Sequence, residues 1–268
     1  MAASKIITSQ NLKSFLDEKA AQYEQPGFIT DDPISVPHLF SKKQDIEIAG
    51  FFAAILAWGN RKSIINSCHK LLQRMDHAPY DFIMHFEESD LESFLGFAHR
   101  TFNAIDLFHF FDFLKYHYRD IDEPSLETAF SKHIHKKDDN IEQALTGFYH
   151  SFFNGDVFPH FPSRTTKHIA SPAKKSACKR LNMFLRWMVR SNSKGVDFGL
   201  WKKIRPSQLI CPLDVHVARV AKHFGLMQRP QTDWLSAVEL TSQLKQFDPK
   251  DPVKYDFALF GLGVVERF

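Results

Sequence analysis

The sequence lacks the features that define several large protein classes. Its three cysteines, Cys68, Cys178 and Cys211, are odd in number and far apart, which argues against a disulfide framework and indicates a reducing compartment. The longest apolar run, residues 48–59, is too short to span a bilayer. The first ten residues contain no apolar segment of the kind found in secretory signals. We therefore expect a cytoplasmic protein without a membrane segment.

Familiar cofactor and hydrolase motifs are also missing. No phosphate-binding glycine loop and no Gly-x-Ser-x-Gly elbow occurs, which argues against the common nucleotide-binding and serine hydrolase folds. His133 and His135 are the only hint of a metal-binding pattern, and no cysteine accompanies them. We expect no metal and no other cofactor.

The composition that remains is globular and unevenly charged. Hydrophobic residues make up 44% and charged residues 24% of a 268-residue chain, enough for one large or two small domains. Residues 160–205 contain twelve Lys and Arg and a single acid, Asp197. This block therefore carries +11, and because the whole chain carries +3, the rest carries −8. Such a block suggests a polyanionic partner, although a solvated lysine-rich surface is the plainer alternative.

Hydrophobic periodicity predicts helices almost everywhere and no strand-rich segment, which favours an all-α fold. The predicted helices cover residues 11–22, 46–58, 64–75, 102–118, 125–134, 141–153, 177–190, 214–224, 233–247 and 251–265. The segment at 46–58 is apolar nearly all round and predicts a central buried helix. Residues 26–43 and 154–172 are rich in proline or turn-forming residues and predict irregular connections, whereas 78–98 suggests short helices. Asp251-Pro252 is a plausible start for the last helix.

The predicted helix at 177–190 combines an apolar face with a basic stripe. The apolar face comprises Leu181, Phe184, Leu185 and Met188. Lys179, Arg186 and Arg190 fall almost opposite, where they could follow a phosphate backbone or form an ordinary solvated face.

Lys179 is distinct because it lies in the first turn, where the helix dipole disfavours an ammonium. Lys174, Lys175 and Arg180 are close in sequence and act in the same direction. Crowded cations favour the neutral amine, which is the nucleophilic form of a lysine.

The stretch CPLDVHVARVAKHFGL, residues 211–226, predicts another helix. Its apolar face is formed by Val217, Val220, Ala221 and Phe224. Gly225 suits the left-handed position that ends a helix, and Asp214 suits the N-cap. Asp214 could be a cap, a catalytic acid, or both, and we favour both roles.

Together these motifs resemble the helix-hairpin-helix DNA glycosylase superfamily over roughly residues 45–265. Asp214, His216 and Arg219 match the Val-Asp-Thr-His-x-x-Arg-Val motif of endonuclease III-like members in order and spacing. Lys179 resembles the lysine that begins the helix after the hairpin, and a shift in the alignment would assign that role to Lys174, Lys175 or Lys194 instead. Residues 54–61 (AILAWGNR) resemble the segment that enters DNA, and residues 257–263 resemble the helix before the iron–sulfur loop. The pattern is most similar to an uncharacterised bacterial family within the superfamily, with archaeal 8-oxoguanine glycosylases as relatives.

The sequence departs from the family pattern in three places. The hairpin stretch, residues 171–178 (SPAKKSAC), has no glycine, whereas the family's hairpin uses Leu-Pro-Gly-Val-Gly for close backbone approach to phosphate. The 35-residue separation of Lys179 and Asp214 is longer than in endonuclease III and nearer that of the archaeal group. No cysteine quartet follows Gly263, so no iron–sulfur cluster is expected.

The resemblance implies a two-lobed helical bundle, with residues 45–190 forming a barrel domain that includes the modified hairpin. Residues 1–44 and 191–268 would form the second domain. It also implies a monomeric DNA N-glycosylase that excises a damaged base from double-stranded DNA. Oxidised purines are a candidate lesion, and lyase activity is a candidate second activity. Lys179 and Asp214 would be catalytic, with Trp58 or Trp187 in the base pocket. DNA contacts would come from Asn60, Arg61, Lys174, Lys175, Arg180, Arg186, Arg190 and Arg219, and His216 would be a structural hydrogen-bonding residue.

Two other functions remain open. A non-catalytic nucleic-acid-binding protein could keep the same scaffold, and the glycine-free hairpin favours this reading. A plain helical interaction protein could use its basic face for an acidic partner. The salt dependence of DNA binding separates the last alternative from the others.

Overall fold

The computed structural model describes residues 9–119 and 124–268 and is mostly helical. The α-helices are α1 (Ser9–Tyr23), α2 (Lys43–Ile55), α3 (Arg61–Gln73), α4 (Pro79–His85), α5 (Ala104–Arg119), α6 (Glu127–Ser131), α7 (Glu142–Phe152), α8 (Lys179–Val189), α9 (Val215–His223), α10 (Trp234–Phe247) and α11 (Tyr255–Phe260). Short 3₁₀ turns join many of them, and a π-helical turn, η9 (Gly261–Val265), follows α11. Strands β1 (Ala98–His99) and β2 (Phe102–Asn103) form a small antiparallel hairpin.

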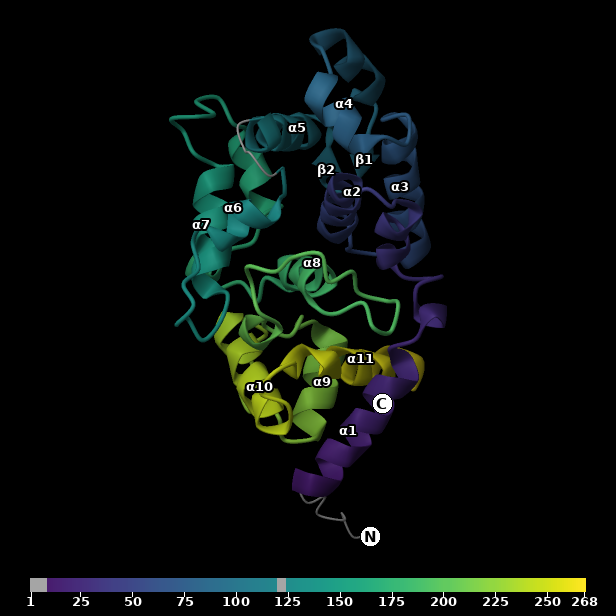
Figure 1. Ribbon diagram of the computed structural model, residues 1–268, viewed down its shortest axis with the longest axis vertical. Helices are drawn as coiled ribbons and strands as arrows, with labels where there is room; N and C mark the ends of the chain where they lie inside the picture. The colour runs from purple at the N-terminus through teal and green to yellow at the C-terminus, as the bar shows by residue number, and fades with distance from the viewer. Residues whose placement is uncertain (1–8, 120–123) are drawn as a thin grey trace.

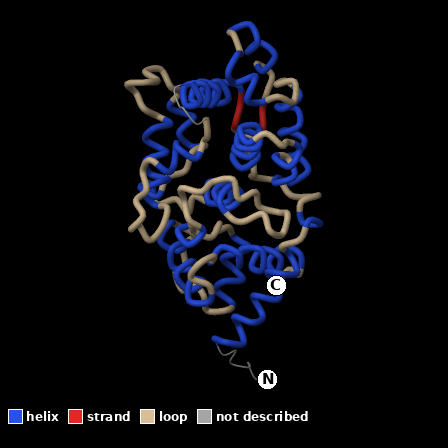
Figure 2. The backbone as a smooth tube through the Cα atoms, in the orientation of Figure 1, coloured by secondary structure: helices blue, strands red, loops and turns tan. Residues whose placement is uncertain are grey.

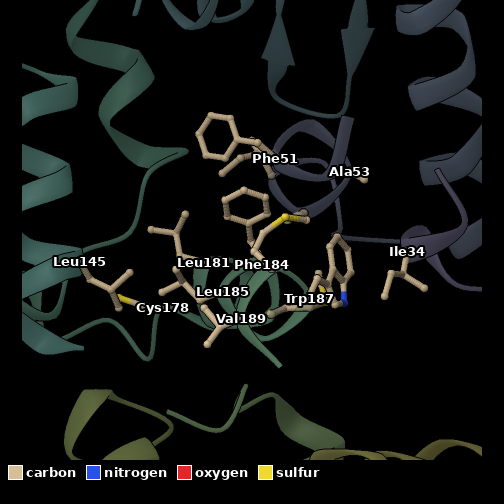
Figure 3. Packing of buried hydrophobic residues seen from close by; sticks show 14 of the residues in the cluster. Ile34, Phe51, Ala53, Leu145, Cys178, Leu181, Phe184, Leu185, Trp187 and Val189 are labelled. Atoms are coloured by element: carbon tan, nitrogen blue, oxygen red, sulfur yellow. The ribbon is translucent and has the colours of Figure 1, made fainter. Parts of the chain in front are cut away.

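Helix α8 lies between two groups of helices (Figure 1). Helices α2 to α7 lie on one side of it, and α1, α9, α10 and α11 lie on the other. Long loops run beside α8 (Figure 2), and buried side chains from α2, α7 and α8 meet around it (Figure 3). A continuous hydrophobic cluster joins both groups. The division into residues 45–190 and 1–44 plus 191–268 therefore stays a prediction, and its boundary crosses this cluster.

Helix α2 is buried nearly all round, as predicted: every residue from 46 to 55 is buried. Among them is Glu47, which the sequence analysis did not single out. Its carboxylate accepts hydrogen bonds from Tyr118 Oη (2.9 Å), Ser125 Oγ (2.6 Å) and Trp201 Nε1 (2.7 Å). Burial raises the pKa of Glu47, and these donors oppose the rise. The carboxylate thus joins three segments that are far apart in the sequence.

The predicted helices are confirmed within a few residues, with two differences. Residues 98–103 form the β1–β2 hairpin, whose two-residue strands are too short to produce a periodic pattern. The predicted helix at 251–265 is instead a 3₁₀ turn, α11 and the π-helical turn in succession. Asp251 does not cap it through its side chain, because that carboxylate accepts hydrogen bonds from Arg190.

Candidate functional site

A cavity of about 480 Å³ lies where the start of α8, the start of α9 and the turn after α2 meet. Lys179, Asp214 and Trp58 line it together, although they come from three separate parts of the sequence. Its volume is in the range of pockets that take small organic groups.

Lys179 is the first residue of α8, as predicted. The residue before it, Cys178, has a φ of 51°, so the chain turns sharply into the helix. The Lys179 amine lies 3.5 Å from Met183 Sδ. Among residues 9–119 and 124–268, no carboxylate forms an ion pair with it. An amine at a helix start that is not held in a direct ion pair is well placed to act on a ligand in the cavity.

The hairpin stretch before α8 reaches left-handed backbone conformations without glycine. Lys175 has a φ of 59° and ends a 3₁₀ turn, Pro172–Lys174. Its carbonyl accepts a hydrogen bond from Trp234 N (3.3 Å), which fastens the stretch to the start of α10. Lys174 is exposed and packs on the Tyr149 ring, with Nζ 4.4 Å from the centroid. Lys174 and Lys175 thus present cations where the glycosylase pattern would present bare backbone.

Asp214 is the N-cap of α9, as predicted. Its Oδ1 accepts hydrogen bonds from His216 N (2.9 Å) and Val217 N (3.0 Å). Both bonds end on the same oxygen, so the cap does not use Oδ2. At the other end of α9, Gly225 has a φ of 71°, which confirms the predicted left-handed terminus. Capping therefore leaves one carboxylate oxygen available at the cavity.

Two further carboxylates line the cavity, and the sequence analysis missed both. Asp32 is buried, and its Oδ1 accepts a hydrogen bond from Ile34 N (3.1 Å). Asp256 is buried in the first turn of α11 and pairs with Arg186. Burial raises the pKa of both carboxyls, and nearby cations, Lys179 among them, oppose the rise. The Asp-Pro step at Asp32 was a sequence signal for a turn, but nothing in the sequence placed it at this cavity.

The turn after α2 contributes Trp58 and Gly59 to the cavity. Trp58 is partly exposed, and the Arg100 guanidinium lies over its ring, 4.6 Å from the centroid. Arg61 also lines the cavity and stacks on Phe260 at 4.9 Å. Asn60 is exposed and caps α3, with Oδ1 accepting from Ser63 N (3.2 Å).

Arg180 lines the cavity, but its guanidinium contacts the protein itself. It donates to the carbonyl oxygens of Ile55 and His168, the latter at 3.1 Å. No carboxylate among the described residues pairs with this guanidinium, so nothing offsets the effect of burial. Burial lowers the pKa of Arg180 to about 10. Its contacts tie the end of α2 to α8.

The predicted basic stripe on α8 is wrong for Arg186 and Arg190, which are each only 4% exposed. Arg186 pairs with Asp197 and Asp256, and Arg190 pairs with Asp197, Asp251 and Glu24. Burial alone would lower the pKa of both guanidinium groups, but the carboxylates outweigh it and raise both. Arg186 also lines the cavity, but its guanidinium is held by two of these carboxylates. Both arginines are buried and therefore do not form an exposed stripe that could follow a phosphate backbone.

Trp187 is also wrongly predicted as a base-stacking residue. Its side chain is fully buried among the apolar residues around α8 (Figure 3) and does not line the cavity. Trp187 faces the core because it lies on the apolar side of the helix, one turn from Phe184.

Two residues of α9 are placed differently from their predicted roles. Arg219 donates to Gly263 O (2.8 Å) and Phe268 O (2.7 Å), which ties the C-terminal segment to α9. His216 lines the cavity with an exposed side chain. Within the described residues, its imidazole takes part in no hydrogen bond. The predicted structural hydrogen-bonding role of His216 is therefore wrong.

No group of three His, Cys, Asp or Glu side chains in the described residues could hold a metal ion. None of the helices described here is long and apolar enough to cross a membrane.

Comparison with known proteins identifies the family. Residues 32–265 match the family model described as "Protein of unknown function (DUF2400)". Because this match covers most of the 268 residues, the chain belongs to that family. No curated protein and no solved structure matches the chain.

Proposed function

We propose that this protein is a DNA N-glycosylase with associated lyase activity, built on a two-lobed scaffold of the helix-hairpin-helix type. One observation carries the proposal: Lys179 and Asp214, matched separately to the motifs of that superfamily, line the same cavity. Each lies at the start of a helix, and neither forms an ion pair with another described residue. A helical interaction protein would not need an unpaired amine and a carboxylate in one cavity.

The proposed reaction begins with a damaged base turned out of the duplex into the cavity. As the bond between the sugar C1′ and the base nitrogen breaks, its electron pair leaves with the base and positive charge develops on the sugar. Asp214 stabilises that charge through its free oxygen. The neutral Lys179 amine forms a bond to C1′ and loses a proton, which the departing base takes up. The bond between C1′ and the ring oxygen then breaks, the ring oxygen takes the second amine proton, and an imine remains between Lys179 and C1′.

The partner proposed is damaged double-stranded DNA, bound by a monomer in the cytoplasm. Exposed cations on the hairpin stretch, Lys174 and Lys175, lie on the chain segment that leads into Lys179. They suit phosphate binding as point charges. A cavity of about 480 Å³ is large enough for an oxidised purine, the lesion class we favour.

Borohydride trapping tests the proposal directly. Duplexes carrying 8-oxoguanine or an abasic site are incubated with wild type, Lys179→Ala and Asp214→Asn in the presence of borohydride, which reduces an imine to a stable adduct. We expect an adduct with wild type and none with Lys179→Ala. Asp214→Asn should bind the duplex with wild-type affinity and lose turnover by at least a hundredfold, typical for removal of transition-state charge stabilisation.

The alternative function is non-catalytic nucleic-acid binding on the same scaffold. The observation that favours it lies in the stretch at residues 171–178. There, lysine side chains stand where the superfamily has glycines that allow close contact between the backbone and phosphate. Tight, salt-sensitive binding to both duplexes without any adduct would support it over catalysis.

A further inference from the structure

The β1–β2 hairpin presents one arginine beside the cavity. Its strands pair Ala98 with Asn103 and His99 with Phe102, so Arg100 and Thr101 form the two-residue turn. Arg100 has a φ of 57°, a left-handed backbone conformation that is unfavourable for an arginine. Glycine or asparagine would adopt this conformation at a lower cost in free energy, so turn formation alone does not account for an arginine here.

The hairpin is held firmly against the turn that follows α2. His99 is 3% exposed, and its ring nitrogens contact Ser67 Oγ at 2.9 Å and Trp58 O at 3.4 Å. Arg164, from the basic block, donates to Thr101 O at 2.9 Å. The turn tip is thus fixed from both sides, and its position relative to Trp58 is set.

The Arg100 guanidinium is exposed and has no charge partner. It lies 4.6 Å from the centre of the Trp58 ring, and Trp58 lines the cavity. Gly59 allows this approach, because a Cβ at that position would come within 2.6 Å of Arg100 Nη1. Within residues 9–119 and 124–268, the guanidinium has no hydrogen bond and no ion pair.

Trp58 supplies the ring on which this cation lies. Its own Nε1–H is buried and has no acceptor in the described residues, so it is not a donor that a ligand in the cavity could reach. The edge of the cavity beside Arg100 therefore carries a cation that the protein leaves unpaired, which suits an anionic ligand.

We propose that Arg100 contacts the phosphodiester backbone at the mouth of the cavity, beside the nucleotide whose base enters it. This inference rests on the proposed function. Arg100 is a substrate-binding residue here, and its stacking on Trp58 reduces the conformational freedom that a phosphate contact would otherwise have to restrict. Arg186 and Arg190 of α8 are buried and paired with carboxylates, so they do not make that contact. Arg100 takes over a phosphate contact that the sequence had suggested for α8.

Fluorescence anisotropy with two labelled duplexes tests this contact. One duplex carries a tetrahydrofuran abasic analogue, which cannot form an imine, and the other is undamaged. The variant is Arg100→Gly, because glycine adopts the positive φ of the turn without strain and preserves the hairpin. The control is Arg119→Ala, which removes an exposed arginine at the end of α5 that does not line the cavity.

We expect Arg100→Gly to raise Kd for the abasic duplex five- to tenfold. The slope of log Kd against log salt concentration should fall by about one, as for the loss of a single phosphate contact. Kd for the undamaged duplex should change less than twofold, and Arg119→Ala should match wild type on both. Thermal unfolding of Arg100→Gly should coincide with that of wild type.

Other outcomes separate the two proposals. If wild type binds and gives the borohydride adduct while Arg100→Gly binds equally well, the Arg100 contact is wrong and the proposed function stands. An equal loss on both duplexes would also overturn it, since the contact would not belong to the cavity mouth. If wild type binds neither duplex, the proposed function falls and the Arg100 contact falls with it.

Discussion

The two ends of α8 treat their cations in opposite ways. At the start, Lys179 and Arg180 line a cavity and form no ion pair within the described residues. In the second half, Arg186 and Arg190 are buried and surrounded by carboxylates. Burial lowers the pKa of Arg180 to about 10, whereas the carboxylates raise the pKa of Arg190.

The position of a cation along a helix therefore does not determine whether it pairs with a carboxylate or lies unpaired beside a cavity. A buried charge is usually paired, and in the second half of α8 other segments bring Asp197, Asp251 and Glu24 to the arginines. At the start of α8, carboxylates line the same cavity as Lys179, but none of the described ones forms an ion pair with Lys179 or Arg180. An unpaired cation beside a cavity is available for a ligand, and a paired one maintains the fold.

The largest expected effect is on the paired half. Arg190→Met leaves buried Asp197 without one of its partners, and we expect a loss of about 3–5 kcal/mol in the free energy of unfolding, the usual cost of breaking a buried pair. Urea denaturation followed by circular dichroism measures it. Lys194→Met, an exposed lysine in the same basic block, is the matched control and should change stability by less than about 0.5 kcal/mol. A loss below 1 kcal/mol for Arg190→Met would contradict the assigned role.

His117 tests the same rule for a buried base without a carboxylate. Burial lowers the pKa of His117 to about 4, and its Nε2 lies 3.0 Å from Ser125 O. As pH falls below about 6.5, the unfolded chain binds a proton that the folded protein does not, so this contribution is full above that pH and is lost toward pH 4. With His117→Gln, which can still donate to that carbonyl, the stability lost between pH 7 and 4.5 should shrink by about 2 kcal/mol. Urea titrations at both pH values check this, and an unchanged difference would disprove it.

Asp214 separates capping from catalysis with a smaller effect. Asp214→Ala should lower the free energy of unfolding by about 1 kcal/mol, because α9 loses its cap. Asp214→Asn should cost only a few tenths of a kcal/mol, since asparagine caps as well. Both should abolish turnover if the carboxylate is catalytic. Loss of adduct in the alanine variant alone, measured beside urea denaturation, would mean that only the cap matters.

The smallest effect concerns Lys179 itself. Lys179→Ala removes a cation from the positive end of the helix dipole and breaks no ion pair within the described residues. We expect the free energy of unfolding to stay within about 0.5 kcal/mol of wild type, even though the borohydride adduct is lost. A loss of 2 kcal/mol or more would show that Lys179 belongs with the structural arginines, and would reverse the comparison of the two ends of α8.

Local signals in the sequence predicted much of this molecule. The buried character of α2, the Asp214 cap and Gly225 all follow from periodicity and capping preferences within about a dozen residues. The sequence motifs also singled out Lys179, Asp214 and Trp58, which line one cavity.

The failures involve contacts between distant parts of the chain. Arg190 is buried because Glu24, 166 residues earlier, and Asp251, 61 residues later, reach it, and no local pattern encodes that. Asp32 and Asp256 reach the cavity in the same way. A helical wheel of the α8 sequence alone does not distinguish an arginine that is buried and paired from one that is exposed to solvent.

The cap on α9 also has an evolutionary consequence. Because both backbone bonds end on Oδ1 of Asp214, helix stability by itself would tolerate asparagine or serine at this position during divergence. Only a demand on the second oxygen would restrict the position to aspartate. If the proposed chemistry is correct, lineages that keep the fold but carry asparagine or serine at this site should be those that have lost the activity.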